Sequence, residues 1–156
     1  MSLVECVPNF SEGRRPEVIA AIREAIAGVE GTVILDVSSD PSHNRTVVTF
    51  VAPVASAANA AFAGIAKAAE LIDLNKHEGE HPRIGATDVC PFIPLEGSSM
   101  DDCVLLARTL GERVGVDHLE AVGEIGPLAL DRGGQSLGEH VVDLDRDDAL
   151  HVRQQR

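Results

Sequence analysis

Residues 32–52, TVILDVSSDPSHNRTVVTFVA, contain the pattern that decides the fold of this chain. Residues 32–37 form a short apolar run rich in β-branched side chains, and residues 45–52 form a second run of this kind. Such runs, bounded by turn residues, are typical of β-strands. The residues between them are Ser, Asp, Pro, His and Asn, which favour a turn. The stretch therefore predicts two strands that follow each other directly along the chain.

Apolar residues at helical spacing flank these two strands on both sides. Pro16 suits the first turn of a helix, and Pro53 opens an Ala-rich helix predicted to reach about Asn75. The expected strands cover residues 3–9, 32–37, 45–52 and 87–95, and the expected helices cover residues 16–29, 53–75 and 100–114. The order β-α-β-β-α-β-α predicts an α/β (α+β) fold, a ferredoxin-like split βαβ with helices packed on a mixed or antiparallel sheet. Two helices are expected on one face of the sheet and the third elsewhere.

Composition and charge narrow the function classes. The chain has 156 residues and a formal net charge of −12, which disfavours nucleic-acid partners because they need a positive field. The uncharged stretch 46–66 is rich in Ala and lacks Leu, so we expect no membrane span. All four aromatic residues are Phe, which predicts a core of Val, Ile, Leu and Ala. Three cysteines without a CxxC spacing favour reduced thiols in a cytoplasmic protein.

Residues 77–81, HEGEH, match the H-E-x-x-H pattern of zinc hydrolases. On a helix, His77 and His81 would share a face and hold zinc, with the first Glu as a base. Gly79 would weaken that helix by about 1 kcal/mol relative to Ala. Pro82 also biases the residue before it away from helical angles. A zinc hydrolase is therefore one alternative for this segment, and a solvated polar loop is another.

A third alternative makes His81 a general acid or base, since an imidazole titrates near neutral pH. Glu78 or Glu80 could orient the imidazole, and Arg83 could hold a carboxylate through two parallel hydrogen bonds. A further polar segment, residues 8–13, lies where the first strand meets the first helix. It is either a binding loop or an ordinary turn.

Three long motifs occur in order along the chain: VECVPNFSEGR at residues 4–14, LDVSSDPSHNRTVVTF at residues 35–50, and LIDLNKHEGEHPRIGATDVCPFIPL at residues 71–95. Together they resemble the glutamate formimidoyltransferase family, whose fused form also carries a cyclodeaminase. The resemblance covers roughly Leu3 to Val114. It implies transfer of the formimino group of N-formimidoyl-L-glutamate to N5 of tetrahydrofolate, in histidine breakdown and one-carbon metabolism.

The resemblance also implies roles for individual residues. His81 is the expected catalytic acid and base, tetrahydrofolate is the co-substrate, and no metal is used. The expected substrate-binding residues are Asn9, Arg45, Glu80 and Arg83, with the arginines pairing with glutamate carboxylates. The assembly implied is a homodimer, or a complex in which a complementary chain completes the cleft.

The sequence departs from the family in two places. The position of Ser38 is acidic in some members, so one polar contact to substrate differs. The resemblance stops near residue 115, and we expect residues 1–115 to form an N-terminal subdomain. Residues 116–156 are rich in Gly and Asp, with one short strand over residues 141–144, and we expect a divergent, weakly structured tail from a frameshift, a truncation or divergence. The second subdomain would then be absent, and a non-catalytic subdomain that needs a partner chain is the alternative function.

Overall fold

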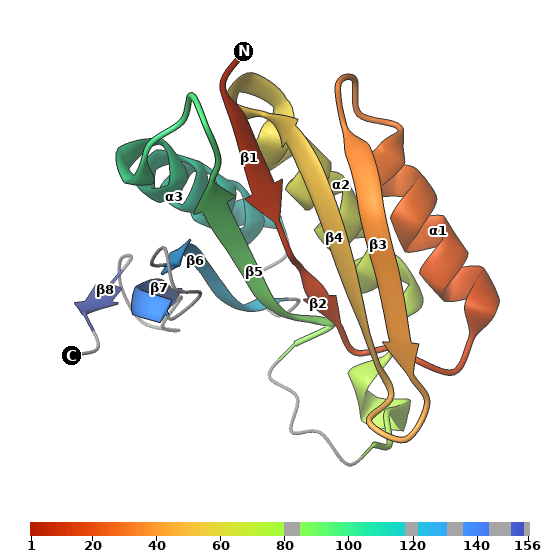
Figure 1. Cartoon of the computed structure of the whole chain (residues 1–156). Coiled ribbons are helices and arrows are strands. Elements are labelled where there is room, and N and C mark those ends of the chain that lie inside the picture. Colours follow the sequence, from red (N-terminus) through yellow and green to blue (C-terminus); the bar gives the residue numbers. More distant parts are fainter. Residues whose placement is uncertain (80–84, 118–121, 131–135, 144–150, 155–156) are drawn as a thin grey trace.

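The computed structural model describes residues 1–79, 85–117, 122–130, 136–143 and 151–154. Its strands are β1 (Leu3–Cys6), β2 (Asn9–Phe10), β3 (Val33–Asp40), β4 (Arg45–Pro53), β5 (Thr87–Pro94), β6 (Val122–Leu130), β7 (Ser136–Asp143) and β8 (His151–Gln154). Its helices are α1 (Pro16–Ala27), α2 (Val54–Leu71), α3 (Met100–Asp117) and the short 3₁₀ helix η1 (Leu74–Lys76). The α-helices pack on one sheet (Figure 1), which confirms the expected α+β fold class.

In the sheet, β4 lies between β3 and the β1–β2 pair, and β5 lies on the other side of that pair. These strands pair antiparallel, whereas β6 pairs with β5 in parallel and continues to β7 and β8. Helix α1 joins β2 to β3, and β4 lies between these two strands in the sheet. This arrangement is that of a split βαβ unit. The expected first strand over residues 3–9 is interrupted, since β1 ends at Cys6 and β2 begins at Asn9.

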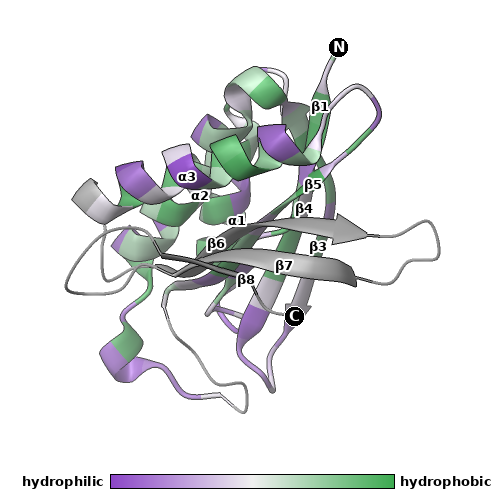
Figure 2. Ribbon diagram, turned by 90° about the vertical axis from the view of Figure 1, so that its left-hand side faces the viewer, coloured by the Kyte–Doolittle hydropathy of each residue, from purple (hydrophilic) through white to green (hydrophobic). Residues whose placement is uncertain are grey.

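Helices α1, α2 and α3 lie side by side on one face of the sheet (Figures 1 and 2). The prediction that the third helix would pack elsewhere is wrong, because α3 packs against α2, β5 and β6. The buried apolar residues of α3 recur at helical spacing, which gives it an apolar stripe toward the sheet: Cys103, Leu106, Ala107, Leu110 and Val114. Burial alternates along β4, so its other side chains, among them Arg45 and Val47, face away from the helices.

The core lies between the sheet and the helices (Figure 2), and Val, Ile, Leu and Ala supply most of it, as predicted. Three of the four phenylalanines, Phe10, Phe50 and Phe92, are fully buried there on β2, β4 and β5. Small residues dominate the buried stripe of α2: Ala57, Ala60, Ala61, Gly64 and Ala68. They let the helix come close to the sheet, and a Cβ on Gly64 would lie 3.3 Å from the Phe10 ring.

The ends of two helices follow from local contacts. Helix α2 ends at Leu71, before the predicted end near Asn75, because Ile72 has an extended backbone (φ −103°, ψ 115°). Helix α3 begins with a capping box, in which the Asp102 N–H donates to Ser99 Oγ at 3.2 Å and the Ser99 N–H donates to the Asp102 carboxylate at 2.7 Å. Within the described residues, no helix has the length and apolar character needed to cross a membrane.

Beyond α3, the described residues form β6, β7 and β8, which extend the sheet past β5. The short strand predicted over residues 141–144 falls in β7, apart from residue 144, which lies outside the described residues. The predicted boundary at residue 115 falls inside α3, which runs to Asp117. That residues 116–156 are a divergent tail stays a prediction.

Candidate functional site

Two of the predicted substrate-binding residues, Asn9 and Arg45, meet on the side of the sheet opposite the described helices. Strand β2 pairs with β4 so that Asn9 lies opposite Val47, two residues beyond Arg45. The Arg45 guanidinium donates a hydrogen bond from Nη2 to Oδ1 of Asn9. The Asn9 amide donates in turn from Nδ2 to the Val7 carbonyl at 2.9 Å. Both ends of the Asn9 amide are therefore engaged, and the guanidinium is held at a defined place.

The other predicted site residues, Glu80, His81 and Arg83, lie outside the residues that the structure describes. Their roles stay predictions. The structure describes the chain on either side of them, at residues 77–79 and 85–88, and both flanks are held by side chains close to β2.

A hollow of about 380 Å³ opens beside Arg45 and is lined by Ser38, Asp40, His43, Arg45 and Val47. The imidazole Nδ1 of His43 lies 2.7 Å from Oδ2 of Asp40. The backbone N–H of His43 and then its imidazole, together with the Ser42 N–H, hold the pKa of Asp40 below its ordinary value. The hollow thus offers a guanidinium that can bind a carboxylate and an imidazole–carboxylate pair that can exchange protons.

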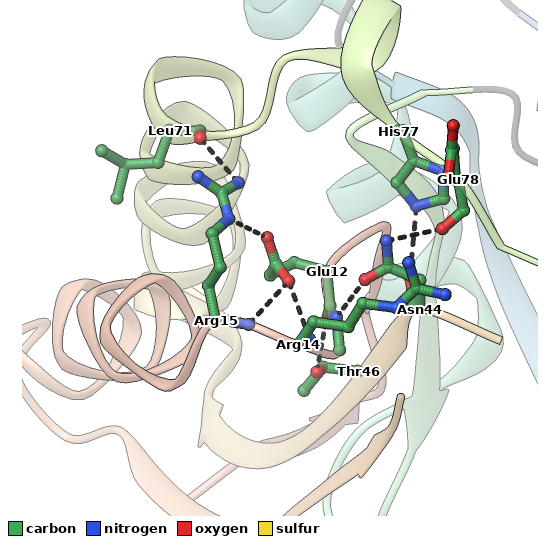
Figure 3. Close-up of polar contacts among 9 residues, drawn as sticks. Glu12, Arg14, Arg15, Asn44, Thr46, Leu71, His77 and Glu78 are labelled. Carbon is green, nitrogen blue, oxygen red and sulfur yellow. Dashed lines mark hydrogen bonds and ion pairs between the residues drawn. The ribbon is translucent and has the colours of Figure 1, made fainter. Parts of the chain in front are cut away.

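Asn44 links three segments of the chain (Figure 3). The Gly13 N–H donates to its Oδ1 at 2.8 Å, and its Nδ2 donates to the Glu78 carbonyl at 2.9 Å. His77 donates from Nε2 to the Asn44 backbone carbonyl at 3.2 Å. Residues 77–78 are therefore fixed to the turn between β3 and β4, on the N-terminal side of Glu80 and His81.

Ser11 and Asp88, both buried, hold the other flank of the same segment. The Ser11 hydroxyl donates to the Gly85 carbonyl at 2.8 Å, and the Ser11 N–H donates to the Ala86 carbonyl at 2.9 Å. The Gly85 N–H donates to Oδ1 of Asp88 at 3.2 Å. Since Ser11 follows β2 directly, both flanks of residues 80–84 are held near the end of the sheet that carries Asn9.

Glu12 is a buried carboxylate that organises the start of α1 (Figure 3). Its Oε1 accepts from the N–H groups of Arg14 (2.8 Å) and Arg15 (2.9 Å), and its Oε2 accepts from Arg15 Nε at 2.6 Å. Arg15 also donates to the Leu71 carbonyl at the end of α2 at 3.1 Å. Burial raises the pKa of Glu12. The two backbone N–H groups and the Arg15 guanidinium lower it by more, so the net pKa lies below the ordinary value.

A second hollow, of about 500 Å³, lies between Glu12, Asn44 and His77, next to Arg14, Arg15 and Lys76. Two of its cations are paired, Arg15 with Glu12, and Lys76 with Asp73 at 3.4 Å. Its positive charge is therefore largely balanced within the protein. The hollow therefore marks the place where the contacts of Glu12 and Asn44 lie side by side. It is not a site of concentrated positive charge.

We expect Glu12→Gln to destabilise the protein at pH 7 by about 2 kcal/mol, because hydrogen bonds to a carboxylate are lost from a buried site. A carboxyl with a lowered folded pKa stabilises fully above its unfolded pKa of about 4.3, and this contribution disappears as pH falls through the folded pKa. The stability gap between Glu12→Gln and the parent should therefore shrink below about pH 4. Urea unfolding at pH 7 and at steps down to pH 3 measures this gap, with Glu17→Gln, an exposed change in the first turn of α1, as the control. A gap that stays constant over this range would contradict the prediction.

The zinc alternative loses its structural premise at His77. Helix η1 ends at Lys76, and His77 has an extended backbone (φ −78°, ψ 131°), so no helix runs through the first histidine of HEGEH. The Nε2 atom of His77 is directed to the Asn44 carbonyl. Among the described residues, no three His, Cys, Asp or Glu side chains are grouped to hold a metal ion, and His81 lies outside those residues.

The three cysteines are free thiols in the core. Cys6 and Cys90 lie with their Sγ atoms 3.6 Å apart on the neighbouring strands β1 and β5. Burial raises the pKa of the Cys6 thiol, with Cys90 adding to the effect, and burial followed by the Asp102 charge raises the pKa of Cys103 to about 11. These two thiols stay protonated at neutral pH, which makes them poor nucleophiles.

The residues that link the site segments were not recognised from the sequence. The sequence places Asn44 in a polar segment that is either a binding loop or an ordinary turn, and Glu12 in the similar segment at residues 8–13, and it assigns neither residue a role. Two glycines carry the signal that could have found the links. A Cβ on Gly13 would lie 2.4 Å from the Asp40 carbonyl oxygen, and a Cβ on Gly79 would lie 2.6 Å from the His43 carbonyl oxygen. Both glycines therefore pack directly against the backbone of the β3–β4 turn.

Comparison with known proteins gives consistent matches. Residues 3–122 match the family described as the formiminotransferase domain, N-terminal subdomain. The chain is 61% identical over 115 residues to the glutamate formimidoyltransferase of Thermoplasma acidophilum. This alignment covers 74% of this chain and 38% of that protein. It is 56% identical over 112 residues to the formimidoyltransferase-cyclodeaminase of Rattus norvegicus. This alignment covers 72% of this chain and 21% of that protein.

A third relative, the glutamate formimidoyltransferase of Streptococcus pyogenes serotype M1, is 46% identical over 112 residues. The aligned part of the chain spans 38% of the length of the two glutamate formimidoyltransferases and 21% of the rat protein. The family match includes Asn9, Arg45 and the whole HEGEHPR segment. Since it also covers most of the chain, the protein belongs to the formiminotransferase N-terminal subdomain family.

Proposed function

We propose that this chain supplies the N-terminal part of a glutamate formimidoyltransferase site, which moves a formimino group from N-formimidoyl-L-glutamate to N5 of tetrahydrofolate. The observation that carries the proposal is that, in a chain of this family, both flanks of the segment containing His81 are held close to the strand that carries Asn9. The names of the relatives, two glutamate formimidoyltransferases and a formimidoyltransferase-cyclodeaminase, support it.

The proposed chemistry needs one group that can both accept and donate a proton. N5 of tetrahydrofolate attacks the formimino carbon, a C–N bond forms, and a tetrahedral intermediate results. N5 then loses its proton, the glutamate nitrogen gains one, and the bond between that nitrogen and the formimino carbon breaks. We propose that the His81 imidazole performs both transfers in turn, since it titrates near neutral pH.

The proposed binding roles follow from charge. Both substrates carry carboxylates, whereas the chain has a net charge of −12, so binding needs locally placed cations. Arg45, held by Asn9 beside the 380 Å³ hollow, is proposed to pair with a glutamate carboxylate. Arg83 is proposed for a second carboxylate, and Asn9 and Glu80 are proposed to position the donor.

The proposal extends to the setting of the reaction. We propose a cytoplasmic enzyme of folate and histidine metabolism that uses tetrahydrofolate as co-substrate and no metal. It works as a homodimer, or with a complementary chain that completes the cleft. We propose that residues 1–115 form the subdomain and that residues 116–156 are a divergent tail.

A second candidate is a subdomain that is inactive until another chain completes it. Two observations favour it. The aligned part of the chain spans only 38% of the two glutamate formimidoyltransferases. Val33 and Leu35 on strand β3, at the edge of the sheet, are 58% and 57% exposed. Exposed apolar side chains on an edge strand are typical of a surface that receives a partner.

A transfer assay decides between the two candidates. The purified chain is incubated with N-formimidoyl-L-glutamate and tetrahydrofolate, and the folate product is followed by its absorbance after acid treatment. Catalytic turnover by the chain alone supports autonomous transfer. A folded protein, judged by circular dichroism and cooperative unfolding, that gives no product contradicts autonomous transfer and supports the incomplete subdomain.

A further inference from the structure

We propose that Asn44 is a positioning residue for the transfer reaction, because it holds residues 77–79, and with them the start of the segment that carries His81, against the β3–β4 turn. This inference rests on the proposed function. It concerns a residue that does not need to touch substrate, and the contacts that it uses all join described residues.

Asn44 has the conformation and burial that such a link requires. Its φ of 51° lies in the left-handed region, where Asn is one of the few residues other than Gly that fits readily. It is buried, and both ends of its amide are used, Oδ1 by the Gly13 N–H and Nδ2 by the Glu78 carbonyl. One side chain therefore joins the segment after β2 to the segment before Glu80.

The backbone of the turn is enclosed between two glycines. A Cβ on Gly13 would lie 2.4 Å from the Asp40 carbonyl oxygen, and a Cβ on Gly79 would lie 2.6 Å from the His43 carbonyl oxygen. The turn thus contacts both segments through backbone atoms, while the Asn44 amide supplies the hydrogen bonds between them. Backbone packed on backbone leaves little freedom to slide, so the hydrogen bonds fix the register of the contact.

The distance along the chain makes this contact relevant to the reaction. His81 follows Gly79 by two residues, which span at most about 7 Å. The position of residues 77–79 therefore sets where the chain enters the segment that contains His81. Misplacement of a reacting group by about 1 Å can lower the rate by about 100-fold.

Two substitutions separate the contacts of Asn44. Asn44→Asp keeps an acceptor for the Gly13 N–H but turns the Nδ2 donor into an oxygen that faces the Glu78 carbonyl oxygen. Asn44→Gly keeps the left-handed backbone accessible and removes both side-chain hydrogen bonds. Ser42→Ala is the matched control in the same turn, since Ser42 contacts Asp40 through its backbone N–H. Each variant is first shown to be folded by its unfolding transition.

The test combines hydrogen exchange at the amides of residues 77–79 with the kinetics of the transfer reaction. We expect faster exchange at these amides in both Asn44 variants, a fall in kcat of about 10- to 100-fold per folded molecule, and a much smaller change in KM. Ser42→Ala should change neither measurement. A purely structural role would lower the unfolding midpoint and leave kcat per folded molecule unchanged.

The outcomes distinguish this inference from the proposed function. Unchanged exchange at residues 77–79 in Asn44→Gly would overturn the inference that Asn44 holds these residues against the β3–β4 turn. Faster exchange with kcat unchanged would overturn the positioning role and leave the proposed function intact. A parent chain that folds but shows no turnover would overturn autonomous transfer and the positioning role with it, whatever the exchange pattern.

Discussion

His81→Ala is expected to lower kcat for formimino transfer by about 100- to 10,000-fold, because a positioned acid and base typically contributes this much. The reaction needs one proton removed from N5 and one delivered to the leaving glutamate nitrogen. Alanine can do neither, and water in its place is poorly oriented. The sigmoidal dependence of rate on pH that the ionisation of a single imidazole imposes should disappear in the variant. Steady-state kinetics of parent and variant between pH 5 and 9 measure both effects.

The same experiment on His43→Ala tests the assignment of the base. The His43 imidazole lines the hollow beside Arg45, and its Nδ1 lies 2.7 Å from the Asp40 carboxylate. We expect His43→Ala to lose much less activity than His81→Ala. A full loss of rate in His43→Ala, with His81→Ala still active, would transfer the acid and base role to the His43–Asp40 pair.

The architecture could be predicted because it is encoded locally. The apolar run at residues 45–52 became β4, and the helix expected after Pro16 is α1. In β4 the burial alternates residue by residue, which is the period that a half-covered strand requires. The element order then limited the choice of folds, since few topologies accommodate it.

The position of α3 and the break between β1 and β2 could not be predicted in this way. An amphipathic helix shows that it has a face to bury, but its sequence does not say which neighbour covers it. The break at residues 7–8 depends on how β1 and β2 pair with β4 and β5 at the same time. Both are decided by contacts between segments far apart in the sequence.

The sequence motifs name candidate site residues whose roles stay predictions, and they do not reveal the residues that link the segments of the site. Asn9 and Arg45 were named from their motifs, and the structure brings them into contact. The links through Ser11 and Asn44 join residues 74 and 34 positions apart, which local pattern cannot reveal. Asn44 looked like an ordinary turn residue because its left-handed backbone is also what a turn requires.

Gly13→Ala is expected to destabilise the protein by about 3 kcal/mol, at the upper end for added volume in a packed interior. The new Cβ would lie 2.4 Å from the Asp40 carbonyl oxygen and 2.6 Å from the Arg45 nitrogen. Both are backbone atoms of strands paired in the sheet, so neither can turn aside as a flexible side chain would. Relief requires the β3–β4 turn to move, and the bond from the Gly13 N–H to Asn44 moves with it. Urea unfolding of parent and variant measures the loss.

Gly28→Ala is the matched control, because Gly28 has a helical backbone (φ −71°) and its nearest neighbour to a new Cβ is 3.3 Å away. We expect its stability to stay within about 1 kcal/mol of the parent, since Ala favours helical backbone over Gly. A Gly13→Ala protein as stable as Gly28→Ala would mean that the turn can yield without loss. The β3–β4 turn would then be too flexible to fix the position of Asn44, and residues 77–79 would not be held rigidly by it. A large loss of stability confined to Gly13→Ala would instead show that the close packing of Gly13 fixes the turn. The Asn44–Glu78 hydrogen bond would then start from a rigid support.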